Sequence, residues 1–99
     1  MISVVGLGNA ASSIADLFSS TPEYNVYRLA SKIKRGKNKK VLKDFRDPEE
    51  YEKNVPNLKN FFKDIDDEVQ FFIVGSSMSS NYALGVLQQI KNKNINLFY

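Results

Sequence analysis

The residues best suited to chemistry lie near the amino terminus, in the segment VVGLGNAASSIADLF. Gly6, Gly8 and Ala11 fit the pattern G-x-G-x-x-G/A, which binds nucleotide pyrophosphates when it joins a strand to a helix. Glycines allow the tight turn and the approach of a phosphate, while backbone amides and the helix dipole attract the anion. The candidate phosphate-binding residues are Gly6, Gly8, Asn9, Ala10, Ala11, Ser12 and Ser13. The alternative is that the glycines serve the geometry of the turn alone.

The dinucleotide form of this pattern predicts an acidic residue about 20 residues further on, for the ribose hydroxyls. That region reads RLASKIKR and contains no acid. Ser31, Lys32 and Arg35 are suited instead to the 2′-phosphate of NADP. NADP is therefore an alternative ligand of the first loop.

A second loop of small polar residues follows the most apolar stretch of the chain, VQFFIV. Its backbone amides and hydroxyls could also contact phosphate. The candidate residues here are Gly75, Ser76, Ser77, Ser79, Ser80 and Asn81.

Alternating strand and helix patterns surround these loops. Apolar runs predict strands over 2–5, 25–30, 69–74 and 95–99. The first helix is expected from Asn9, its N-cap, with Ala10, Ile14, Leu17 and Phe18 inward, and a second from Pro48, capped by Asp47. Two more are predicted by the inward stripes Leu58, Phe61, Phe62, Ile65 and Ala83, Val86, Leu87, Ile90.

This alternation predicts an α/β fold, a Rossmann-like three-layer sandwich with a mostly parallel sheet. The last apolar run reaches Tyr99 without a closing turn. We therefore expect residues 1–99 to form one domain that is incomplete at its carboxyl end.

Taken together, the two loops and their flanking elements resemble the amino-terminal half of the tubulin/FtsZ family of GTPases. Those proteins open with a strand, a glycine-rich loop and a helix, as in VVGLGNAASSIADLF. A helix, an acidic turn and an apolar strand follow, as in NLKNFFKDIDDEVQFFIV. Next come the signature loop and its helix, where this chain has GSSMSSNYALGVLQQIKN, and a further strand that matches INLFY.

The resemblance implies binding of GTP or GDP with Mg²⁺ and nucleotide-dependent assembly of the full-length protein into a homo-oligomer or polymer. It also implies that the base-contacting helix and the catalytic acidic loop lie beyond these 99 residues. No catalytic residue is therefore expected in this chain. Two other functions remain open, an NAD(P)-binding fragment of an oxidoreductase and a non-catalytic interaction module.

Composition excludes several other classes of protein. The chain has no Cys and no His, so it cannot build a disulfide, a Ser-His-Asp triad or a zinc site of Cys and His. No apolar run suits a membrane span, and the amino terminus lacks the basic-then-apolar layout of a signal peptide, so we expect a cytoplasmic protein. Six of the nine residues from Lys32 to Lys40 are basic, which indicates a solvated loop rather than the broad basic face of a nucleic-acid binder. The acidic run DIDDE, residues 64–68, indicates a polar turn rather than a cation site.

Overall fold

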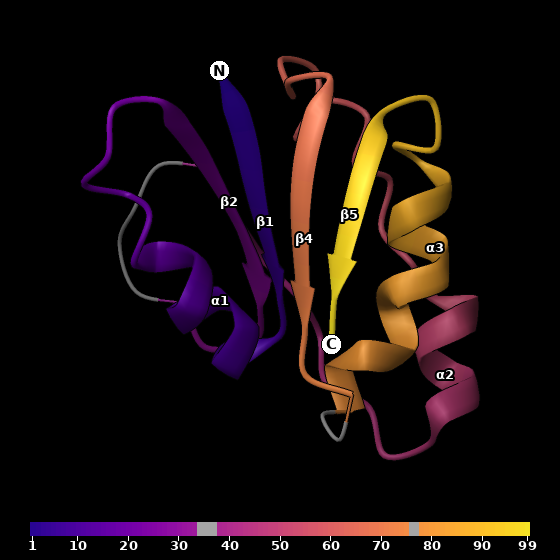
Figure 1. Ribbon diagram of the computed structural model, residues 1–99. Helices are drawn as coiled ribbons and strands as arrows, with labels where there is room; N and C mark the ends of the chain where they lie inside the picture. Colours follow the sequence, from indigo (N-terminus) through magenta and orange to yellow (C-terminus); the bar gives the residue numbers. More distant parts are fainter. Residues whose placement is uncertain (34–37, 76–77) are drawn as a thin grey trace.

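The computed structural model describes residues 1–33, 38–75 and 78–99. These residues form a five-stranded, all-parallel sheet in the order β3-β2-β1-β4-β5 (Figure 1). The strands are β1 (Ile2–Leu7), β2 (Tyr24–Ala30), β3 (Lys39–Val41), β4 (Glu68–Ile73) and β5 (Asn94–Phe98). This strand order confirms the expected Rossmann-like α/β class.

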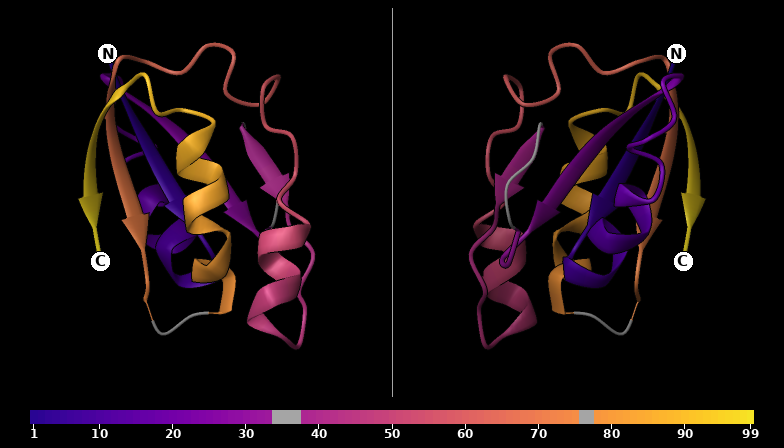
Figure 2. Two further views of the ribbon diagram at one scale, coloured as in Figure 1. Left: turned by 90° about the vertical axis from the view of Figure 1, so that its right-hand side faces the viewer. Right: turned by 90° about the vertical axis from the view of Figure 1, so that its left-hand side faces the viewer.

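Helices cover the two faces of the sheet. The connections β1 to β2 and β4 to β5 run in opposite directions across the sheet, and right-handed crossovers therefore place their helices on opposite faces. Figure 2 shows α1 (Asn9–Asp16) on one side and α2 (Pro48–Lys53) and α3 (Ala83–Gln88) on the other. A 3₁₀ helix, η1 (Met78–Tyr82), leads into α3.

The larger core lies between the sheet and α2 and α3. It joins alternate residues of the strands, such as Val5 and Phe71, to Val86 and Ile90 of the α3 region. Two tyrosines fasten the 43–45 segment to this core. The buried Tyr51 hydroxyl accepts the Phe45 N–H at 3.0 Å and donates to the Phe45 carbonyl at 3.1 Å. The Tyr82 hydroxyl donates to the Lys43 carbonyl at 2.6 Å, and burial, with Tyr51 and Asp44 nearby, raises the pKa of Tyr82.

The helix α1 occupies the expected residues but turns a different face to the sheet. Ala11, Ser12 and Ala15 are buried, whereas Ala10, Ile14 and Leu17, which the pattern predicted to face inward, are exposed. The reason is the close approach of α1 to β1, which leaves room only for small side chains. The larger Phe18 is half-buried beyond the helix, against Tyr24 and Phe72.

The helix predicted around Leu58 and Phe62 does not form. Residues 59–64 make turns, with one bond of the α-helical kind, Phe62 N–H to the Leu58 carbonyl at 2.9 Å. The side chain of Gln89 takes the Leu58 N–H at 2.7 Å and so ties this segment to α3. Leu58, Phe62 and Ile65 are nevertheless buried as expected, because the turns direct all three into the core.

The two edge strands of the sheet, β3 and β5, differ from what the sequence pattern predicts. The end of the basic segment, Lys39–Val41, forms β3 rather than a loop, because pairing with the free side of β2 satisfies its backbone. At the opposite edge, β5 has the apolar sequence of a buried strand but is mostly exposed.

Candidate functional site

The two predicted loops leave neighbouring parallel strands at the same edge of the sheet. Leu7, the last residue of β1, is in register with Ile73, the last residue of β4. β1 continues through Gly6 rather than ending there. The loops therefore start side by side, at the lower edge of the sheet in Figure 1, where the arrowheads point. The connections from β1 and β4 diverge at this point, and in open α/β sheets such a switch point is where ligands bind.

The backbone geometry of the first loop requires glycine at both position 6 and position 8. A Cβ on Gly6 would lie 2.5 Å from the Ala11 carbonyl oxygen and 2.8 Å from the Ser12 Cα. Gly8 has φ 95° and ψ 166°, a backbone region that only glycine occupies readily. These requirements agree with the alternative in which the glycines serve geometry, and they are equally compatible with a bound phosphate.

The amino end of α1 presents backbone donors. Gly8, rather than the expected Asn9, is the N-cap, and no side chain caps the helix. The Gly8 N–H bonds to the Leu29 carbonyl at 2.7 Å, and the Ser12 N–H bonds to the Gly8 carbonyl at 2.8 Å. Helix geometry leaves the amides of Asn9, Ala10 and Ala11 without an acceptor inside the helix. These three N–H groups can donate hydrogen bonds to a bound anion.

The polar side chains of the first loop are largely engaged within the protein. The buried Ser12 hydroxyl donates to the Gly6 carbonyl at 3.1 Å, and the exposed Ser13 hydroxyl donates to the Asn9 carbonyl at 3.2 Å. The Asn9 amide group donates to Ser31 Oγ at 3.3 Å, and its oxygen accepts the Lys32 N–H at 3.0 Å. Asn9 thus joins the first loop to the end of β2. Arg35 lies outside the described residues.

The second loop is described only in part, because Ser76 and Ser77 lie outside the described residues. Gly75 is exposed, and its carbonyl accepts the Ser80 hydroxyl at 3.3 Å. Ser79 is buried within η1, and the Asn81 amide group donates to the Met78 carbonyl at 2.8 Å.

A polar cavity of about 310 Å³ opens beside the first loop. Lys32, Arg28 and Asp16 line this cavity. Arg28 Nη1 lies 3.6 Å from Asp16 Oδ1. The remaining lining residues are Asn9, Ser12, Ser13 and Ile33. The structure therefore brings three residues of the first loop next to Lys32, which the sequence proposed for a 2′-phosphate.

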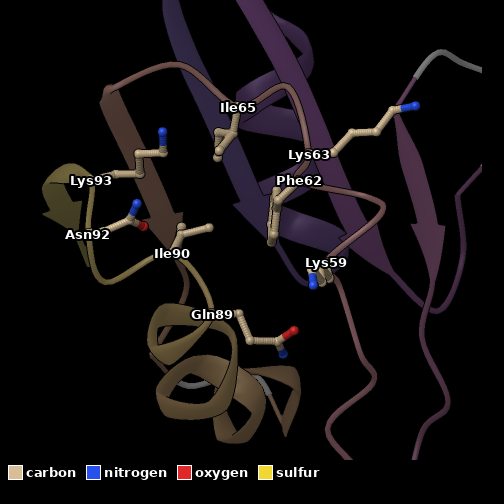
Figure 3. A pocket seen from close by; sticks show the side chains of 8 residues that line it. All are labelled: Lys59, Phe62, Lys63, Ile65, Gln89, Ile90, Asn92 and Lys93. Atoms are coloured by element: carbon tan, nitrogen blue, oxygen red, sulfur yellow. The ribbon is translucent and has the colours of Figure 1, made fainter.

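Another cavity, of about 470 Å³, lies away from both loops, between the 59–65 segment and the turn before β5 (Figure 3). Phe62, Ile65 and Ile90 form its apolar wall. Its Gln89 side chain already donates to the Pro56 carbonyl and accepts the Leu58 N–H. Of its lysines, Lys93 is paired with Asp67 at 3.1 Å.

The acidic turn holds a structural carboxylate that the sequence pattern did not single out. Asp66 accepts hydrogen bonds from Ser3 Oγ at 2.8 Å and Asn25 Nδ2 at 2.9 Å, and its own N–H donates to Ser3 Oγ at 2.9 Å. Partial burial opposes ionisation, but the bonds from Asn25 and Ser3, with the terminal ammonium and Lys93, lower the pKa of Asp66. Asp66 therefore ties the segment before β4 to β1 and β2.

Comparison with known proteins adds no relative: no protein-family model, curated protein or solved structure matches the chain. Across residues 1–33, 38–75 and 78–99, no helix has the length and apolar character needed to cross a membrane.

Proposed function

We propose that the two loops bind the phosphates of a guanine nucleotide, GTP or GDP with Mg²⁺, and that the protein assembles with copies of itself in a nucleotide-dependent way. The observation that carries the proposal is the register of Leu7 with Ile73, which starts both loops side by side at the switch point. The guanine base and the assembly are inferred from the resemblance to the tubulin/FtsZ family.

The phosphate contacts would come mainly from the backbone. The amides of Asn9, Ala10 and Ala11 lie at the uncapped amino end of α1, where the helix dipole favours an anion. Gly75 opens the second loop on the neighbouring strand and is exposed. Mg²⁺ would be held by phosphate oxygens, and no residue of this chain is given a catalytic role.

The test is thermal unfolding of the chain with millimolar GTP, GDP, ATP, NADH or NADPH, each with Mg²⁺. A ligand at 100 times its Kd stabilises the native state by about 2.7 kcal/mol, which raises Tm by roughly 10 °C or more. The proposal predicts this shift with GTP and GDP. ATP should give a similar shift, because the two loops contact only phosphates and the resemblance puts the base-contacting helix beyond these 99 residues.

A variant that adds a negative charge makes the test specific to the first loop. Ala10 is exposed in the first turn of α1, so Ala10→Asp should add about 0.5 kcal/mol to the free energy of unfolding without ligand. The same carboxylate should abolish the nucleotide shift by repelling phosphate. Ser20→Asp, an exposed position beyond the far end of α1, makes the same change of charge and should keep the shift.

The cavity beside the first loop favours a second candidate, an NADP-binding protein. Lys32 follows β2 and lines this cavity with Arg28 and Asn9, a location suited to a 2′-phosphate. This candidate predicts a shift with NADPH but not NADH, and loss of that preference in Lys32→Gln. Absence of a shift with every nucleotide would count against both candidates and would favour an interaction module.

A further inference from the structure

We propose that the cavity between the 59–65 segment and the turn before β5 binds a small organic anion, with a carboxylate beside Lys59 and an apolar body against the cavity wall. This site is separate from the two nucleotide loops. The loops leave the carboxyl ends of β1 and β4, whereas the segments around this cavity lead into the amino ends of β4 and β5. The inference therefore does not depend on the proposed function.

The two sides of the cavity are held together by the side chain of Gln89. Its amide group donates to the Pro56 carbonyl at 2.9 Å, and its oxygen accepts the Leu58 N–H at 2.7 Å. The opposite side of α3 faces β5, where Leu84 and Leu87 line a different groove. The cavity thus lies on the side of α3 away from the free edge of β5, and its shape does not depend on what covers that edge.

The size of the cavity and its wall suit an organic molecule. Its volume of about 470 Å³ lies within the range of small-molecule sites, roughly 300–1,000 Å³. Phe62, Ile65 and Ile90 form the wall, and each is at most 8% exposed because it also belongs to the core. This packing fixes the apolar surface before any ligand arrives. A single inorganic ion would leave most of the cavity to water, whereas a body of several carbon atoms would cover the wall.

The charged residues of the lining select a negative head group. Lys59, Lys63 and Lys93 line the cavity, and among the described residues no Asp or Glu does. Lys93 is paired with Asp67 at 3.1 Å, and the side chain of Lys63 extends away from the apolar wall in Figure 3. The exposed Lys59 lies on the Phe62 side of the cavity and has no ion pair within the described part of the chain. Lys59 is therefore the cation for the carboxylate.

Octanoate is the probe for this site, because it combines a carboxylate with a flexible apolar chain. Partial burial of the chain and one exposed ion pair correspond to a Kd on the order of 1 mM. Octylammonium has the same chain with the opposite charge and should bind about 10-fold more weakly. Acetate has the head group alone and should bind about 100-fold more weakly. Titrations followed by amide NMR shifts should move residues 59–65 and 89–93 and leave residues 6–13 unchanged.

A charge-reversing variant tests the role of Lys59. Lys59→Glu changes an exposed side chain, so the fold should persist. Octanoate should bind about 10-fold more weakly to this variant, and octylammonium about 10-fold more tightly, so that the preference is inverted. The matched control is Lys91→Glu, which makes the same change of charge at an exposed position in the groove on the other side of α3. It should leave the octanoate affinity within about 2-fold of the original.

Several results would overturn the proposal. One is the absence of octanoate binding at 10 times the expected Kd, and another is equal binding of octanoate and octylammonium. Acetate that binds as tightly as octanoate would show that the apolar wall contributes nothing. An unchanged octanoate affinity in Lys59→Glu, or an equal loss in Lys91→Glu, would show that Lys59 does not hold the carboxylate.

Discussion

Gly6→Ala tests whether the close packing of α1 on β1 depends on the missing side chain. The new Cβ would lie 2.5 Å from the Ala11 carbonyl oxygen and 2.8 Å from both the Ala11 carbonyl carbon and the Ser12 Cα. All three are backbone atoms, so no rotation of a side chain can relieve the overlap. The helix would have to move away from the strand.

The expected loss follows from what this movement disturbs. Ala11 and Ala15 have no exposed surface, and an outward shift of α1 would loosen both. Overpacking of a core typically costs about 1–3 kcal/mol, and a clash between two backbone segments belongs at the upper end. A loss of about 3 kcal/mol would lower Tm by roughly 12–24 °C in a domain of this size.

Urea unfolding followed by far-ultraviolet circular dichroism measures this loss. The matched control is Gly75→Ala, at the corresponding loop after β4, where, among the residues that the structure describes, the new Cβ would meet only Tyr99 Cδ1, at 3.7 Å. That is an ordinary contact, so the control should change the free energy of unfolding by less than about 0.5 kcal/mol. If Gly6→Ala were as mild as the control, the packing argument for α1 would be wrong.

Two further changes probe the rest of the fold. Tyr51→Phe should lower the free energy of unfolding by about 1 kcal/mol, because it removes both hydrogen bonds from the half-buried Phe45 N–H and carbonyl. Tyr99→Phe, at an exposed residue, should have no effect on urea unfolding. The lowered pKa of Asp66 means that its ionised form stabilises the native state above its ordinary pKa near 3.8, and that this contribution disappears as pH falls through the folded-state value. Asp66→Asn should therefore destabilise the protein by about 1 kcal/mol at pH 7, and the loss should shrink as pH falls below 3.8; a loss that does not change with pH would contradict this assignment.

For the first loop, the sequence predicts the secondary structure but not the contacts that each side chain makes. The spacing of Gly6, Gly8 and Ala11 predicts a strand, a turn and a helix, and the structure has all three. The burial and the hydrogen-bond partner of each side chain could not be predicted from this spacing. Ser12 was proposed as a phosphate donor, but its hydroxyl is buried and donates to the Gly6 carbonyl. That contact exists only after α1 has packed against β1.

The sequence by itself determined the α/β class and most element positions, because apolar runs, Pro48 and the two glycine-containing loops act through neighbouring residues. Only the tertiary structure decided which face of α1 is buried, that the apolar residues 58–65 reach the core from turns, and that Lys39–Val41 is a strand. It also decided the strand order that puts β1 beside β4 and so brings the two loops together. These outcomes depend on contacts between residues far apart in the chain, which local periodicity does not encode.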